Sequence, residues 1–241
     1  MIGNVTMKTL LKYTLLLGIS FIYSPQIFAL EPVLRFSDLI SGPSSGIGDG
    51  RGEGVIVTIW GQNMGSSQGT SKVIFTASDG KITETSHVYY WKNADGNLPS
   101  GPANLYESHK MQEIAFSIPT AVNGSATIKV EVNGVISNTL PFTVRSGEIV
   151  HVSSIGDDNR AGTFNAPYRT VDKAETSTGL GATIYLHDMA IGNSTEQYAI
   201  YNNTGLKADR SNHIAYVTYP GTRANVTGAN GVWMFRTTGI V

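Results

Sequence analysis

The sequence predicts an all-β protein in two parts, and three observations predict it. Charged residues make up 15% of the 241-residue chain, hydrophobic residues 41%, and 27 residues are glycine, a composition typical of β-structure with many turns. Between residues 34 and 145, apolar and polar residues alternate with the period of a strand that has one buried face. After residue 174, short β-prone runs alternate with glycine and asparagine turns.

The first 29 residues have the features of an export signal. Lys8 and Lys12 give the leading end positive charge, an apolar run follows at 10–23, and Ala29 offers a cleavage site. The apolar run is too short for a convincing membrane span, so we expect no stable span after signal removal, with a retained signal anchor as the alternative. The protein is therefore expected to be secreted or periplasmic, with the cell surface as a further location.

The N-terminal part is predicted to consist of short strands. Val55, Val57 and Ile59 share one strand face, and Asn133-Gly134 is a dipeptide preferred in two-residue hairpin turns. Further strands are predicted at 72–77, 82–91, 113–118, 126–132 and 135–144. About seven short strands at this spacing predict a β-sandwich over residues 30–146.

This part resembles the immunoglobulin-like fold called IPT/TIG. The resemblance is carried by GVIVTIWGQNMG, KVIFTA, EIAFSIP and SATIKVEVNGVISNTLPFTV, and the closing pattern at 133–144 is its most specific element. The stretch 93–111 departs from the family's pattern, because it is longer and more polar than a plain connection. The resemblance implies a spacer, an interaction surface or a weak carbohydrate contact in a secreted protein, and it implies no catalysis.

The stretch 147–174, GEIVHVSSIGDDNRAGTFNAPYRTVDKA, separates the two parts. Its glycines and paired Asp residues predict a tight turn, because Asp bonds its own backbone and Gly accepts positive φ. Thr170 is expected to cap a short helix whose first turn carries Asp172, the favourable charge at that end. Val171 and Ala174 share one face of this helix.

The same stretch resembles the opening of secreted right-handed parallel β-helix proteins, the architecture of many polysaccharide lyases and surface adhesins. The resemblance rests on Gly156, Asp157, Asp158, Gly162, Thr163, Pro167, Thr170 and Ala174, followed by β-prone runs at 182–188, 196–203, 213–221, 224–228 and 231–237. It implies that the helix covers the open end of a solenoid whose first coils occupy 147–241. About two to three coils fit there. Because no closing helix follows, we expect a truncated part of a longer protein.

Candidate site residues fall in two groups. Asp157 and Asp158 could supply oxygen ligands to calcium. The alternative is favoured: they are turn and cap residues, because no later acidic residue completes a calcium loop. The cofactor therefore stays unknown, with calcium considered for the full-length protein. The histidines show no metal-ligand spacing, and no catalytic residue is assigned, since the resemblance places a lyase's residues in middle coils beyond this chain.

The second group consists of aromatic residues that could contact a carbohydrate. Tyr90 and Trp91 could stack on apolar sugar faces, but strand neighbours point to opposite faces, so at least one side is expected to be core. Tyr106 and His109, in the long connection, are comparable candidates.

Together these features predict the N-terminal part of a secreted carbohydrate-active β-helix protein that acts on or binds an extracellular polysaccharide. The main alternative is a non-enzymatic adhesin or glycan-binding protein, and a third is a general interaction module whose β-helix resemblance is fortuitous. The formal charge of −1 and the export signal oppose a nucleic-acid partner. The sequence has no cysteine, so neither disulfides nor thiolate metal sites can form.

Overall fold

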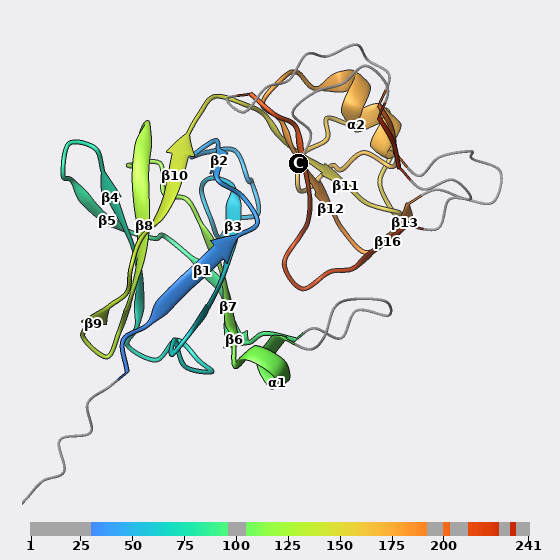
Figure 1. Cartoon of the computed structure of the whole chain (residues 1–241). Coiled ribbons are helices and arrows are strands. Elements are labelled where there is room, and N and C mark those ends of the chain that lie inside the picture. Colours follow the sequence, from blue (N-terminus) through green and yellow to red (C-terminus); the bar gives the residue numbers. More distant parts are fainter. Residues whose placement is uncertain (1–29, 96–104, 192–199, 203–211, 227–231, 235–241) are drawn as a thin grey trace, which may run out of the picture.

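The structure, a computed structural model, describes residues 30–95, 105–191, 200–202, 212–226 and 232–234. These residues form an all-β protein with seventeen strands and two short helices, α1 (Leu105–His109) and α2 (Val171–Ser177) (Figure 1). The expected signal at 1–29 lies outside the described residues. Within the described residues, neither helix has the length and apolar character needed to cross a membrane.

A four-stranded antiparallel sheet forms one layer of the N-terminal part, residues 30–146. Its strand order is β1-β3-β7-β6. The strands are β1 (Val33–Ser37), β3 (Ile56–Gln62), β7 (Gln112–Ser117) and β6 (Val88–Asn93). In β3, Val57 and Ile59 face the core, as their alternation predicts.

A second sheet forms the other layer (Figure 1). Its order is β2-β10-β8-β4-β5, and β9 pairs with β8. The strands are β2 (Ser41–Gly42), β10 (Leu140–Val144), β8 (Ser125–Val132), β4 (Lys72–Ala77), β5 (Ile82–Glu84) and β9 (Val135–Ile136). The turn between β8 and β9 has positive φ at Asn133 and Gly134, which confirms the predicted hairpin.

Two runs predicted as single strands are divided. The run 82–91 becomes β5, which pairs with β4, and β6, which pairs with β7 in the other sheet. The chain crosses between layers at 85–87, where Thr85 N–H donates to Val73 O and Ser117 N–H donates to His87 O. The run 135–144 likewise divides into β9 and β10.

The two sheets share one apolar core. Phe75 of β4 and Phe116 of β7 meet edge to face, with ring centroids 5.8 Å apart. Ile128 and Val130 of β8 are fully buried between the layers. Alternate residues of both sheets therefore supply the burial that holds this part together.

The C-terminal part, from residue 147, contains parallel strands. β11 (Ile149–Val152), β12 (Thr183–Leu186) and β15 (Ala215–Thr218) form one parallel sheet without register shifts. Two further parallel pairs join β13 (Met189–Ile191) to β16 (Ala224–Val226) and β14 (Ile200–Asn202) to β17 (Val232–Met234). No strand is predicted at 149–152, because the whole stretch 147–174 is interpreted from its sequence as the turn and capped helix that separate the two parts.

Helix α2 lies beside β11 and β14 and has the expected cap. The Thr170 hydroxyl accepts a hydrogen bond from Lys173 N–H at 3.2 Å. Val171 and Ala174 are buried in a cluster with Val150 and Val152 of β11. The predicted cap and buried face of this helix are thus confirmed.

Gly162 has a specific reason to be glycine. Its φ is +73°, and a Cβ there would lie 2.2 Å from Cε2 of Tyr168. Tyr168 is buried in the cluster beneath α2, so a side chain at 162 would displace a core ring as well as strain the backbone.

We expect Thr170→Ala to lower the free energy of unfolding by about 1 kcal/mol, the usual cost of losing a helix cap. Urea denaturation followed by circular dichroism measures the change. Thr170→Ser retains the capping oxygen and is the matched control. Equal unfolding midpoints for Thr170→Ala and wild type would contradict the assigned cap.

Candidate functional site

The two parts of the chain meet at the edge of β3. Strand β1 pairs with β3 only as far as the Ser37–Ile59 pair, so the start of β3 lacks a neighbouring strand on that side. The Tyr185 hydroxyl, from β12, fills this position: it accepts a hydrogen bond from Ile56 N–H at 2.6 Å and donates one to Ile56 O at 3.2 Å. A side chain of the second part thus completes the backbone pairing of the first.

The parallel sheet presents alternate residues to the two sides. Ile184 and Leu186 of β12 pack with α2, whereas Tyr185, between them, points to the N-terminal part. Tyr185 is fully buried with Ile56 and Ala115 of the antiparallel sheet. This parallel sheet therefore has apolar contacts on both faces, as parallel sheets require.

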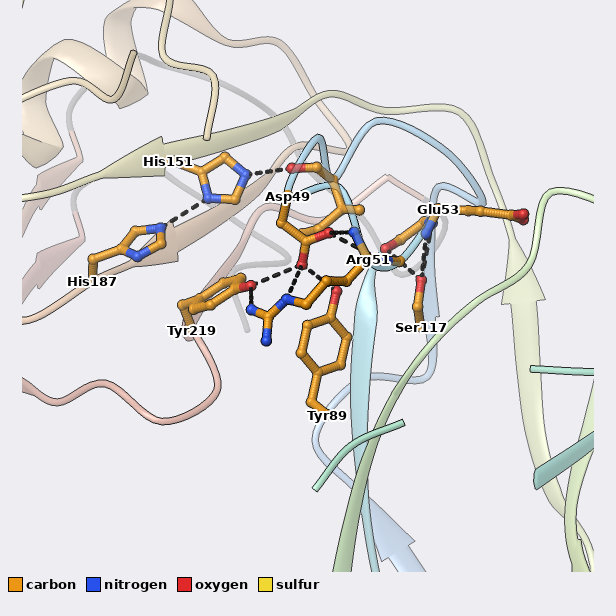
Figure 2. A network of polar contacts seen from close by, with 11 residues as sticks. Asp49, Arg51, Glu53, Tyr89, Ser117, His151, His187 and Tyr219 are labelled. Atoms are coloured by element: carbon orange, nitrogen blue, oxygen red, sulfur yellow. Dashed lines mark hydrogen bonds and ion pairs between the residues drawn. The ribbon is translucent and has the colours of Figure 1, made fainter. Parts of the chain in front are cut away.

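A polar network around Asp49 lies beside this contact (Figure 2). The Asp49 side chain is fully buried and accepts hydrogen bonds from the hydroxyls of Tyr89 at 2.5 Å and Tyr219 at 2.8 Å. Its other oxygen accepts from the backbone N–H groups of Arg51 at 2.8 Å and Gly52 at 3.0 Å. One buried carboxylate thus joins β6 of the first part to the segment after β15.

Arg51 neutralises this carboxylate. Its Nε lies 3.7 Å from Asp49 Oδ2, and its guanidinium also donates to the Tyr219 hydroxyl. The guanidinium carbon lies over the Tyr89 ring at 4.8 Å and the Tyr219 ring at 5.7 Å. Burial acts to raise the pKa of Asp49, but the hydrogen bonds from Tyr89, Arg51, Tyr219 and Gly52 outweigh it and lower this pKa. Asp49 therefore stays ionised.

Two histidines complete the contact. His151 of β11 is fully buried, with Nε2 2.9 Å from Ile47 O and Nδ1 2.9 Å from Nε2 of His187. A carbonyl can only accept, so His151 Nε2 carries the proton and Nδ1 accepts from His187. Burial, with repulsion from His187, lowers the pKa of His151 to about 4, and burial also lowers the pKa of His187. Both rings are therefore neutral near pH 7.

Arg145, at the end of the N-terminal part, supports the connection. It donates to Gly181 O and, at 3.0 Å, to His213 O, while its Nε donates to Ser41 Oγ at 3.0 Å. The backbone turns before β12 and β15 are thereby fixed to β2. We call the contacts of Asp49, Arg51, His151, Tyr185, Tyr219 and Arg145 the seam.

The side chains of both calcium candidates, Asp157 and Asp158, accept hydrogen bonds from neighbouring protein groups. Asp158 accepts from Arg169 N–H at 2.8 Å, Thr170 N–H at 3.0 Å and the Thr170 hydroxyl at 2.9 Å. Asp157 accepts from the backbone and side-chain nitrogens of Asn159. In the part of the chain that the structure describes, no group of three His, Asp or Glu side chains is placed to hold a metal ion. The turn-and-cap interpretation fits these contacts.

Two of the carbohydrate candidates, Tyr90 and Trp91, are neighbours in β6, so their side chains point to opposite faces of the strand. Trp91 is 7% exposed, lies in the core and donates from Nε1 to Met64 O at 2.9 Å. Its side chain thus lies on the face of β6 that points between the sheets, the core side that strand alternation predicts for one of the two neighbours. Tyr90 lies on the opposite face of β6 and is half-buried, with Lys92 Nζ 4.9 Å from its ring centre. Burial raises the pKa of Tyr90 to about 12.

Tyr106 and His109 lie in α1, within the long polar connection 93–111. Tyr106 is half-buried and has Lys110 over its ring at 5.3 Å. His109 is exposed, and its carbonyl accepts from Gln62 Nε2 at 2.7 Å. The rest of this connection, 96–104, lies outside the described residues.

The seam residues themselves were not predicted. Asp49 and Arg51 lie in the glycine-rich stretch 46–54, which has no strand period and no recognisable spacing of functional groups. A usable signal was the separation of His151 from His187, which is 36 residues, two more than the offset of 34 between paired positions such as His151 and Tyr185. That signal has meaning only once the parallel register is known.

Comparisons with known proteins add little. No protein-family model matches the chain, and no curated protein matches it. A solved structure with partial similarity is a structural genomics protein of unknown function from Bacteroides thetaiotaomicron VPI-5482, with a TM-score of 0.30 and 16% identity. The match covers 58% of this chain and 28% of that protein, so this chain spans well under half of that protein's length.

We expect Tyr185→Phe to lower the free energy of unfolding by about 1–3 kcal/mol, because the Ile56 N–H would lose its buried acceptor. Urea denaturation measures the loss. Ile82→Ala, which truncates a 69% exposed side chain of β5, is the control and should change the free energy by a few tenths of a kcal/mol. A similar small change for Tyr185→Phe would show that the hydroxyl is not needed at the seam.

Acid should weaken the seam through His151. Its pKa in the fold, about 4, is below its ordinary value of 6.5, so its neutral form stabilises the fold fully above pH 6.5 and this contribution is lost as the pH falls toward 4. Between pH 7 and 4, wild type should lose up to about 3 kcal/mol more stability than His151→Gln. Urea denaturation across this range tests it, and parallel curves for the two proteins would contradict it.

Proposed function

We propose that this chain is the leading part of a secreted carbohydrate-active protein, in which an immunoglobulin-like β-sandwich of the IPT/TIG kind holds the first coils of a right-handed parallel β-helix. The observation that carries the proposal is the parallel sheet β11-β12-β15, which begins directly after the first part and is fixed to it by Tyr185. The ligand would be an extracellular polysaccharide.

The strand pairing supports the solenoid. The four parallel pairings of the described C-terminal strands join residues 32–35 positions apart, as the paired numbers 149/183, 183/215, 189/224 and 200/232 give, a repeat length in the range of solenoid coils. Along the chain, β12 and β13 are followed by their parallel partners β15 and β16 in the same order. Helix α2 packs beside β11, the first strand of the series, where a solenoid needs a cover for its apolar end.

The two sheets, antiparallel except for the β2–β10 pair, and their shared core support the sandwich. The seam gives this sandwich its proposed role. Tyr185, His151 and Asp49 are buried and hydrogen-bonded, so the sandwich and the coils hold one orientation. A polysaccharide chain that touches both parts would then meet surfaces already arranged for it, which lowers the ordering cost of binding.

No catalytic residue is assigned in this chain, and any catalysis is proposed for the full-length protein. The Asp49 oxygens accept four hydrogen bonds inside the seam, so this carboxylate suits a structural role better than proton abstraction. A lyase would need a base with a shifted pKa in a long groove, which the family resemblance places in later coils. The second candidate function, a non-enzymatic adhesin, shares the same sandwich and coils.

Affinity gel electrophoresis of the mature chain tests the proposal. Gels would contain polygalacturonate, alginate, xylan or galactomannan, and the ultraviolet absorbance of unsaturated uronates would report any cleavage. We expect at least one polysaccharide to slow migration without product formation by this chain. Unchanged migration in every gel would refute a polysaccharide partner. Binding without cleavage by the full-length protein as well would favour the adhesin.

A further inference from the structure

An aromatic pair lies on the outer face of the four-stranded sheet. Phe36 of β1 is 43% exposed and stacks on Trp60 of β3, with ring centroids 5.1 Å apart and planes inclined by 18°. Neither ring belongs to an apolar core cluster of the described residues. The pair therefore presents apolar ring surface to solvent without being needed to fill the core.

A β-bulge shapes this surface. The β1–β3 register shifts between Leu34 and Phe36, so Arg35 has no partner across the strands. Arg35 instead donates from Nε and Nη2 to Gln62 Oε1, at 3.2 and 2.7 Å. Gln62 lies two residues after Trp60 and so shares its face. The bulge thus brings two consecutive residues of an edge strand to the same side, where bulges often re-aim side chains.

Polar contacts fix the Trp60 ring from the other side. Its Nε1 donates to Glu113 Oε2 at 3.0 Å, and Lys92 Nζ lies 3.1 Å from Glu113 Oε1. Lys92 in turn lies over the Tyr90 ring. The Lys92 side chain is 40% exposed and the Glu113 side chain 9% exposed. The aromatic surface is therefore held in place and bordered by hydrogen-bonding groups.

We propose that this surface, the ledge formed by Arg35, Phe36, Trp60, Gln62, Tyr90 and Lys92, binds pyranose rings of a glycan. The apolar C–H face of a pyranose packs on the exposed Phe36–Trp60 rings, while its hydroxyls exchange hydrogen bonds with Arg35, Gln62 and Lys92. A ring face bordered by both donors and acceptors matches a sugar, which has one apolar face and a polar rim.

Size and position identify the occupant. A stable protein interface needs about 800 Å² per partner around an apolar centre, whereas the ledge offers the exposed ring of Phe36 and the half-buried rings of Trp60 and Tyr90 between charged side chains. Trp60 also lies on the same face of β3 as Ile56, which the second part covers through Tyr185. A glycan on the ledge therefore runs along this sheet face toward the C-terminal part.

The ligand class assigned to the ledge rests on the proposed function. The experiment that tests the ledge compares variants and is separate from the test of the proposed function. Phe36→Ala removes an exposed ring from an edge strand, and Ile82→Ala, which truncates a 69% exposed side chain of the other sheet, is the matched control. The probe is the polysaccharide that slows migration of the wild-type chain in affinity gels, chosen among polygalacturonate, alginate, xylan and galactomannan. We expect Phe36→Ala to weaken binding about tenfold, Phe36→Tyr to restore it, and Ile82→Ala to leave it unchanged.

The outcomes distinguish the two proposals. If wild type binds a polysaccharide and Phe36→Ala binds it equally well, the ledge is refuted and the proposed function stands. If wild type binds none of the four, the proposed function fails and the ledge fails with it. Urea denaturation confirms that Phe36→Ala is folded, and should it be unstable, Arg35→Ala replaces it. A dimer in solution that Phe36→Ala abolishes would make a second copy the occupant and overturn the glycan assignment.

Discussion

The pairing of Tyr185 with the backbone of Ile56 is the contact on which the arrangement of this protein depends. A strand whose neighbour ends early has N–H and C=O groups that must find partners when they are buried. Here β1 ends opposite Ile59, so the start of β3 has no neighbouring strand on that side. The missing hydrogen-bond partner is the side chain of Tyr185 from the second part. The antiparallel sheet is thus completed by the parallel one. This dependence explains why the surrounding seam is buried and hydrogen-bonded rather than open.

Around Asp49, the seam contains an ion pair and two neutral histidines, so the charge of this carboxylate is compensated. Asp49 and Arg51 form a pair supported by two tyrosine hydroxyls, and both histidines are neutral. The Asp49 side chain is fully buried whereas the Arg51 side chain is 47% exposed, so the pair contributes little net stability, but removing Arg51 leaves a buried carboxylate without its counter-charge. The polar groups therefore determine which relative position of the two parts is permitted, while apolar burial supplies most of the free energy.

Much of the fold follows from local patterns, and much of the site does not. The turn at Asn133 and Gly134 and the cap at Thr170 depend on neighbouring residues, so the sequence could predict them. The run 82–91 looked like one strand because its apolar character is continuous, yet its two halves pair with different sheets. Trp91 and Tyr90 could be assigned to opposite faces but not to the correct ones without the register. Asp49 became recognisable only when Tyr89 and Tyr219 were brought together by folding.

The distance in sequence between the seam partners has a consequence for synthesis on the ribosome. Tyr185 lies 129 residues after Ile56, and Tyr219 lies 170 residues after Asp49. The N-terminal strands can therefore emerge and pair while the start of β3 still lacks its cover and Asp49 lacks one of its hydroxyl partners. During that interval the uncovered strand edge can accept a foreign strand. Nascent chains would be most vulnerable to aggregation between completion of the first part and emergence of β12.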